Sequence, residues 1–213
     1  MKKIFLFLTV FIITIPLFSQ NANTKMLELI NSIDGIWKID NNNNIYVQDV
    51  LECEGKDKEQ VYFLIRSYFI TTYNDANRVV QLEDKENGIL IGKGCYSNIQ
   101  CDEMLFGLSA KQTFWHIVKC EIRDNRVRVT ITLTHYDVTY PASHSTDMLL
   151  AGIQAGTFSM TNLYPINTSK GKKNTTRDGF LFYKAITNSL GTINEIKKNL
   201  QDNNINNDTN EDW

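Results

Sequence analysis

Two neighbouring strand-like segments, residues 113–123 and 126–138, constrain the fold of this chain more than any other feature. Both are rich in β-branched and aromatic residues, and only Asp124 and Asn125 separate them. A two-residue link of this composition predicts a β-hairpin turn that places Arg123 opposite Arg126. Counting outward from the turn, each strand independently divides its side chains into the same two faces, which supports the register.

The predicted register gives the hairpin one apolar face and one mixed face. The apolar face pairs Ile122 with Val127, Cys120 with Val129, Val118 with Ile131, and His116 with Leu133. The mixed face pairs Glu121 with Arg128, Lys119 with Thr130, Ile117 with Thr132, and Trp115 with Thr134. Because an apolar sheet face must be buried, the first face predicts a covering layer of helices.

The segments around the hairpin supply the remaining elements. Apolar residues recur at helical spacing over 57–73 and from Phe180 to Leu200, and more briefly over 24–33. Strands are expected at 45–53, 79–83 and 89–95, the last two joined through Asn87-Gly88. Residues 142–178 show no clear periodicity, apart from a possible short helix at 148–153 and a basic polar loop at 169–177. The Asn- and Asp-rich tail, 202–213, is expected to be disordered.

The resulting order, β-α-β-β-β-β-α, predicts an α+β domain over residues 45–201, preceded by a helix and loop at 21–44. Several residues and short runs accompany this order and carry a family resemblance: Val61-Tyr62, Tyr68, Tyr73, the run Val79 to Asp84, and the run from Gly88 to Gly94, which begins and ends with glycine. The pattern resembles the exported bacterial family of domains of unknown function with a TBP-like (TATA-binding-protein-like) fold. Arg126-Val127-Arg128 and Leu163-Tyr164-Pro165 are similar too, whereas Tyr68 stands where the family is expected to have Trp. The resemblance implies a curved antiparallel sheet with helices on one face, and it implies no activity.

The first twenty residues predict export. Lys2 and Lys3 precede an apolar run from Ile4 to Phe18, which is the pattern of a cleaved signal peptide. The run is shorter than the roughly 20 apolar residues that span a bilayer, so cleavage is favoured over anchoring. We therefore expect a mature protein with no transmembrane segment, located in the periplasm or secreted.

The charge of the chain disfavours a nucleic-acid partner. The formal net charge is −2, and removal of residues 1–20, which carry two lysines and no acid, makes it −4. Nucleic-acid binding requires a basic surface. The expected partner is instead an envelope protein or a small ligand.

The four cysteines, Cys53, Cys95, Cys101 and Cys120, could pair in an oxidising compartment. Cys95 and Cys101 flank an expected loop and are the best candidates for a disulfide. Buried free thiols are the alternative.

No catalytic motif is present, and no cofactor is predicted. His116 and His135 share the apolar face in the predicted register, together with Cys120, but a metal site needs three or four convergent ligands. His144 lies within a short polar segment with Asp147, where triad geometry cannot form because triad members converge from separate elements.

Three functions remain open. The first is a non-catalytic binding module of the cell envelope. The second is a periplasmic hydrolase or metal-dependent enzyme using His116, His135 or His144 with Asp137 or Asp147. The third is a structural envelope subunit. For the first, the expected contact face is Trp115, Ile117, Glu121, Arg128, Thr132, Thr134 and Tyr136; the alternative is that residues 142–178 cover this face.

Overall fold

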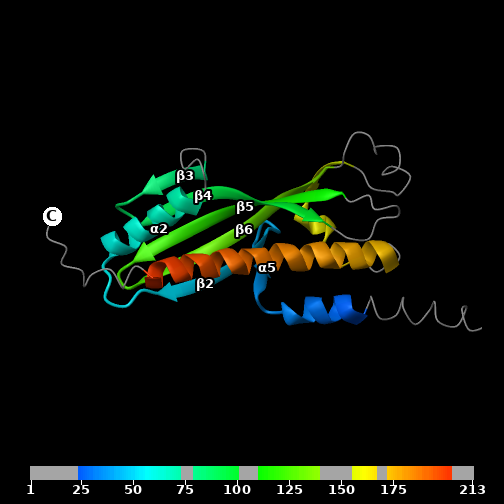
Figure 1. Ribbon diagram of the computed structural model, residues 1–213, viewed down its shortest axis with the longest axis horizontal. Helices are drawn as coiled ribbons and strands as arrows, with labels where there is room; N and C mark the ends of the chain where they lie inside the picture. The colour runs from blue at the N-terminus through cyan, green and yellow to red at the C-terminus, as the bar shows by residue number, and fades with distance from the viewer. Residues whose placement is uncertain (1–23, 73–78, 101–109, 140–154, 167–171, 203–213) are drawn as a thin grey trace, which may run out of the picture.

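The computed structural model describes residues 24–72, 79–100, 110–139, 155–166 and 172–202 (Figure 1). Its centre is an antiparallel sheet of seven strands. The strands are β1 (Trp37–Ile39), β2 (Ile45–Glu52), β3 (Val80–Asp84), β4 (Ile89–Gln100), β5 (Lys111–Arg123), β6 (Arg126–Thr139) and β7 (Gly156–Ser159). Their order is β1-β2-β6-β5-β4-β3, and β7 pairs with β6. This is an unclosed curved sheet of the α+β class, as the resemblance implied.

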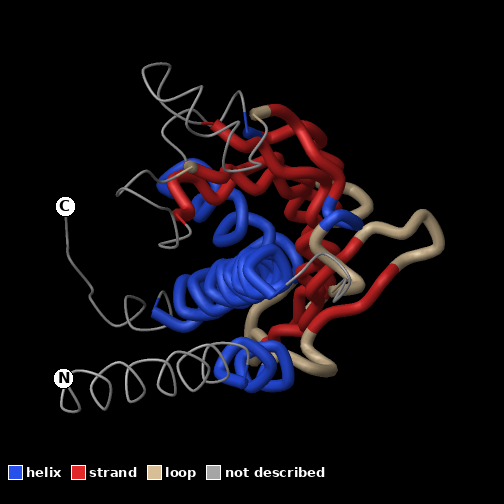
Figure 2. Tube along the Cα trace, turned by 90° about the vertical axis from the view of Figure 1, so that its right-hand side faces the viewer, coloured by secondary structure: helices blue, strands red, loops and turns tan. Residues whose placement is uncertain are grey.

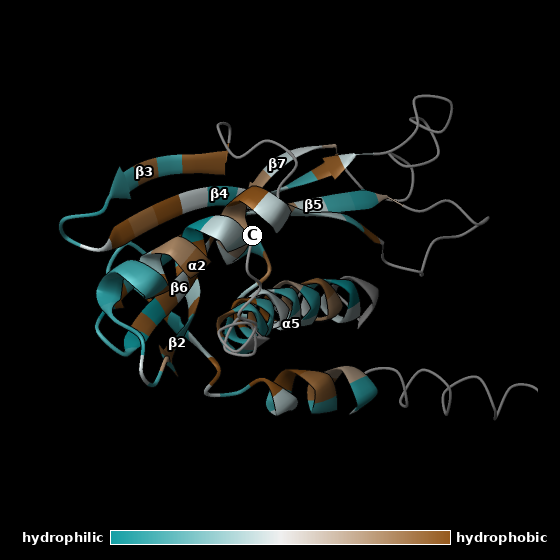
Figure 3. Cartoon of the chain, turned by 60° about the vertical axis from the view of Figure 1, so that its left-hand side comes forward, coloured by the Kyte–Doolittle hydropathy of each residue, from teal (hydrophilic) through white to brown (hydrophobic). Residues whose placement is uncertain are grey.

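The helices cover one side of the sheet, as Figures 1 and 2 show. They are α2 (Lys58–Thr72) and α5 (Lys172–Asp202); a short helix over residues 24–32 lies beside α5, and a 3-10 turn, η3 (Met160–Asn162), follows β7. Figure 3 shows both polar and apolar residues along α2 and α5, as expected for helices that bury one side. Among the described residues, no helix is long and apolar enough to cross a membrane.

Local interactions fix the beginning of α2. Asp57 Oδ1 accepts from the Gln60 amide at 2.9 Å, while Gln60 Oε1 accepts from the Asp57 amide at 3.0 Å. This reciprocal pair satisfies two amide donors that the first turn of a helix leaves free. From there, Val61, Ile65 and Phe69 follow at four-residue intervals and are buried against the sheet.

Phe69 packs where β4 has no side chain. A Cβ at Gly92 would lie 2.2 Å from Cε1 of Phe69, so the ring occupies the space that any larger residue needs. The predicted helix over 57–73 and the strands at 45–53, 79–83 and 89–95 are confirmed within a few residues, except that β4 continues to Gln100.

The hairpin turn is Asp124-Asn125 as predicted, and the predicted register is confirmed from Arg123–Arg126 to His116–Leu133. Beyond this point it is wrong, because Trp115 pairs with His135 instead of Thr134. Thr134 is an extra residue in β6, a β-bulge, so the side chains that follow it change faces.

Two segments differ from expectation. Residues 142–178 contain β7, η3 and the first turns of α5, which begins at Lys172 within the stretch predicted as a basic loop. The N-terminal segment expected as helix and loop also holds β1, whose Trp37 packs edge-on against Tyr164 and Phe182. The predicted signal peptide, most of the tail and the possible helix at 148–153 lie outside the described residues.

The Phe69–Gly92 contact predicts that Gly92→Ala destabilises the fold. We expect a loss of about 1–3 kcal/mol in the free energy of unfolding, because the new methyl group must displace a buried ring. Urea denaturation followed by circular dichroism measures this loss.

Gly191→Ala is the matched control. Gly191 lies inside α5 with open space around the position of a Cβ, so alanine should stabilise the protein by about 0.5–1 kcal/mol. Equal effects of the two substitutions would contradict the proposed packing role of Gly92.

Candidate binding face

The side of the sheet opposite the helices presents a continuous row of side chains that we call the open face. It is defined by alternation along the central strands and by the cross-strand register. Its members include Val50 on β2, Leu82 on β3, Ile89, Ile91, Lys93 and Cys95 on β4, Thr113, Trp115, Ile117, Lys119, Glu121 and Arg123 on β5, and Arg126, Arg128, Thr130, Thr132, His135 and Asp137 on β6. The alternate residues of β5, including Phe114, Val118 and Cys120, are buried beneath the helices.

Trp115 is held in a fixed position at one end of the open face. Its Nε1 donates to Asp137 Oδ2 at 2.7 Å, and the Thr157 hydroxyl donates to Asp137 Oδ1 at 2.6 Å. These two bonds, that of Thr157 foremost, lower the pKa of the Asp137 carboxyl, so it is ionised at neutral pH. His135 stacks beside the indole at 6.0 Å, and Lys93 Nζ lies 5.1 Å from the ring centroid.

The other end of the open face is charged. Glu121 accepts from Arg128 Nε at 2.9 Å and pairs with Arg128 Nη2 at 2.9 Å, the two-bond geometry that suits guanidinium and carboxylate. Lys119 Nζ lies 3.2 Å from the same carboxylate. The bonds from Arg128 above all lower the pKa of Glu121, since they favour its charged form.

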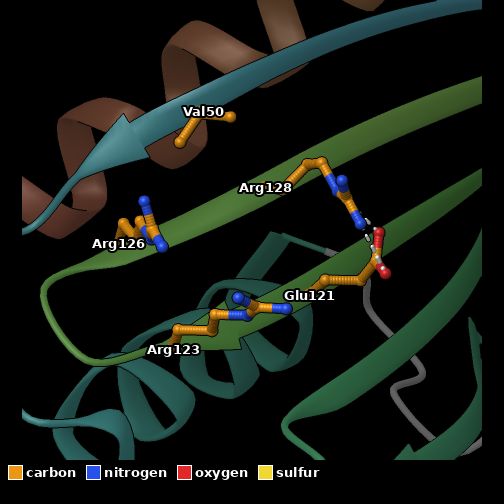
Figure 4. A pocket seen from close by; sticks show the side chains of 5 residues that line it. All are labelled: Val50, Glu121, Arg123, Arg126 and Arg128. Atoms are coloured by element: carbon orange, nitrogen blue, oxygen red, sulfur yellow. Dashed lines mark hydrogen bonds and ion pairs between the residues drawn. The ribbon is translucent and has the colours of Figure 1, made fainter.

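A shallow pocket lies at this charged end, with a volume of about 230 Å³ (Figure 4). Val50, Glu121, Arg123, Arg126 and Arg128 line it, and Figure 4 shows Arg128 joined to Glu121 while Arg123 and Arg126 lie toward the turn. We call this the arginine pocket. Arg123 and Arg126 were absent from the expected contact face, although the predicted register already placed them opposite each other.

Most residues of the expected contact face lie on the open face, namely Trp115, Ile117, Glu121, Arg128 and Thr132. Thr134 occupies the bulge, where its hydroxyl donates to the Trp115 carbonyl at 3.1 Å and contacts His135 Nδ1 at 3.0 Å. Tyr136 was expected beside them, but the structure places it in the core. The bulge turns it toward the helix side, between Phe114 and Phe158, and burial raises its pKa to about 12.

The bulge also separates the two histidines that were expected to share a face. His116 points into the core and His135 lies on the open face beside Trp115. Cys120 remains on the side of His116, while His144 and Asp147 lie outside the described residues. Within the described residues, no three His, Cys, Asp or Glu side chains come together to hold a metal ion.

His116 is a buried polar group. Its ring stacks on Tyr96 at 4.1 Å, and the Tyr96 hydroxyl lies 3.1 Å from Thr192 Oγ1 of α5. Neither ring nitrogen makes a well-formed hydrogen bond among the described residues, although the Phe114 backbone is near enough to oppose the effect of burial on the pKa. Burial lowers the pKa of His116 to about 4, so the ring is neutral at pH 7.

The cysteines differ in exposure. Within the described residues, Cys53, Cys95 and Cys120 form no disulfide; the first and last are buried and Cys95 is exposed. Cys101 lies outside the described residues, so its predicted bond to Cys95 stays a prediction.

Comparison with known proteins bears on the fold. Residues 48–137 match the model of a family described as "Domain of unknown function (DUF4468) with TBP-like fold". A TBP-like protein from Parabacteroides distasonis is similar with a TM-score of 0.53 and 12% identity, covering 76% of this chain and 97% of that one. A DUF4468 family protein from Bacteroides ovatus has a TM-score of 0.49 and 10% identity, covering 75% and 90%. No curated protein matches the sequence. At these identities the first structure supports the fold alone.

The burial of His116 predicts a pH-dependent stability. The pKa of His116 is 6.5 in the unfolded chain and about 4 in the folded protein. Between pH 6.5 and pH 4 the unfolded chain therefore binds a proton at His116 that the folded protein does not bind. Stability is therefore lost as the pH falls from 6.5 toward 4, by about 3 kcal/mol in total. His116→Phe should remove this part of the pH dependence. Urea denaturation of both proteins from pH 7 to pH 4 measures it, and parallel curves would contradict it.

The thiols should differ in reactivity in the native, reduced protein. Burial raises the pKa of Cys120 to about 12, so its thiolate is scarce and shielded, whereas Cys95 is exposed. Iodoacetamide at pH 8 should label Cys95 well before Cys120, as peptide mass spectrometry would record. Labelling of Cys120 at the rate of Cys95 would contradict this.

Omitting the reductant tests the Cys95–Cys101 bond, which would protect Cys95.

Proposed function

We propose a role from the surface of this chain, since the family whose model matches residues 48–137 is one of unknown function: a non-catalytic binding module whose open face contacts a partner in the cell envelope. The proposal rests on the residues themselves, since a fold alone carries no function. The signal-peptide pattern of residues 1–20 supports a periplasmic or secreted location.

The observation that carries the proposal is the apolar exposure of the open face. Ile117 at its centre is 37% exposed, and Val50 on β2 and Leu82 on β3 are each 47% exposed. The half-buried indole of Trp115 lies beside Ile117 along the same face. Apolar and aromatic side chains surrounded by charged ones are the usual composition of a protein contact surface.

The position of Trp115 favours binding further. Its ring is fixed by the hydrogen bond to Asp137, which Thr157 in turn orients from β7. An anchor already held in place loses little conformational freedom on association, so more of its contact energy contributes to affinity.

The separation of the histidines supports a non-catalytic role. His116 and His135 point to opposite sides of the sheet, so they cannot act on one substrate from a shared pocket. The Asp137 oxygens already accept from Trp115 and Thr157, which is the arrangement of a positioning group.

Crosslinking and co-purification from intact envelopes tests the proposal. We expect the wild-type protein to capture a specific partner and the Trp115→Ala/Ile117→Ala variant to lose it, because the variant removes the aromatic anchor and the central exposed apolar side chain. Quantitative mass spectrometry of the captured material is the measurement, and a partner that is a second copy of this chain would point to the structural-subunit function.

The matched control is Phe63→Ala/Ile70→Ala. These α2 side chains are 70% and 44% exposed, so the control removes exposed apolar area from the helix layer. Capture should survive in the control. Equal capture by wild type and the Trp115/Ile117 variant, or equal loss in both variants, would count against the open face as the contact surface.

A further inference from the structure

The arginine pocket concentrates positive charge on an acidic protein. It combines three guanidinium groups with one carboxylate, while the whole chain has a formal net charge of −2. The single carboxylate is fully engaged, because Glu121 accepts two bonds from Arg128 and lies 3.2 Å from Lys119 Nζ. Glu121 is therefore already shared by two cations, Arg128 and Lys119, and does not pair with Arg123 or Arg126.

In the part of the chain that the structure describes, the guanidinium groups of Arg123 and Arg126 are not paired with an acid. They are direct register partners across the hairpin, and both side chains are exposed. Glu52 is the register partner of Arg126 on β2, yet within the described residues neither arginine forms an ion pair with it or with any other acid. Like charges directly opposite each other on a sheet are destabilising, so the pair is costly unless an anion lies between the two groups.

The turn that carries the two arginines is fixed to the rest of the fold. The Asn125 amide donates to the Lys56 carbonyl at 2.9 Å, and the Asn125 carbonyl accepts from the Cys53 amide at 2.7 Å. Asp124 Oδ1 accepts from the Lys58 amide at the start of α2, at 2.9 Å. The two guanidinium groups therefore extend from a rigid base, which favours binding because little backbone order has to be acquired.

We propose that the arginine pocket binds a phosphate group. Two guanidinium groups without a counter-ion match the charge of a phosphate monoester at pH 7, about −1.5 to −2. Their planar N–H donors match phosphate oxygens in pairs, as they do carboxylate oxygens in the neighbouring Arg128–Glu121 pair. The phosphate could belong to a soluble phosphorylated molecule or to a lipid headgroup, which present the same chemistry.

The experiment is binding of inorganic phosphate to the purified mature protein, by titration calorimetry at constant ionic strength. A parallel arm measures co-sedimentation with phosphatidylcholine vesicles, with and without phosphatidic acid. The test variant is Arg123→Gln/Arg126→Gln. The matched control is Lys197→Gln/Lys198→Gln, which removes the same charge from exposed positions on α5.

We expect the test variant to bind about tenfold or more weakly than wild type, and the control to bind as wild type does. Binding of inorganic phosphate would assign a soluble ligand, and binding only of vesicles with phosphatidic acid would assign a headgroup. Denaturation without ligand should show the test variant no less stable than wild type, since it relieves a like-charge pair.

Absence of wild-type binding in both arms, or an equal loss in test and control variants, would overturn the phosphate site. Binding of an oligo-glutamate peptide in place of phosphate would overturn it in favour of an acidic protein segment. The result is independent of the proposed function, because the purified protein is tested without a partner and Trp115 and Ile117 are left intact.

Discussion

The pairing of β5 with β6 is the interaction on which the rest of the fold depends. These two long strands occupy the centre of the sheet, and β4 joins the free edge of one while β2 and β7 join the free edge of the other. Their alternate side chains form the base of the core beneath α2 and α5. Their turn is bonded to the segment that leads into α2, so the strand pair also positions this helix.

A single residue, Thr134, divides this arrangement in two. On the turn side of the bulge β6 pairs with β2, ending at Leu133 with Ile45, and beyond it β6 pairs with β7, beginning at His135 with Ser159. The inserted residue thus coincides with an exchange of neighbouring strands and with a reversal of faces. It brings His135 beside Trp115 on the open face and sends Tyr136 into the core.

These features also show how far the sequence could predict the structure. The register was predictable up to Leu133, because alternation in two strands has to agree and the turn residues set the origin. The bulge was not, because Thr134-His135-Tyr136 fits either register and contains no glycine to indicate an irregularity. β1 and β7 have three and four residues, too few for a period to appear. The first turns of α5 bury Thr175 and Asp178, so they lack the apolar stripe that predicts a helix.

On the open face, the sequence predicts which arginines lie opposite each other, and the structure adds which of them forms an ion pair. The sequence contains the arginines and predicts that two of them are opposed, but it cannot say which of the three pairs with an acid. That depends on Glu121 being within reach of both Arg128 and Lys119. Trp115 and Glu121 are six residues apart on β5, roughly 20 Å at the rise of a strand. A phosphate in the arginine pocket is far smaller than this distance, so it would leave the Trp115 end free. A partner that contacts both ends must extend over about 20 Å, and the difference between the two ends, aromatic at one and cationic at the other, would fix its orientation on the sheet.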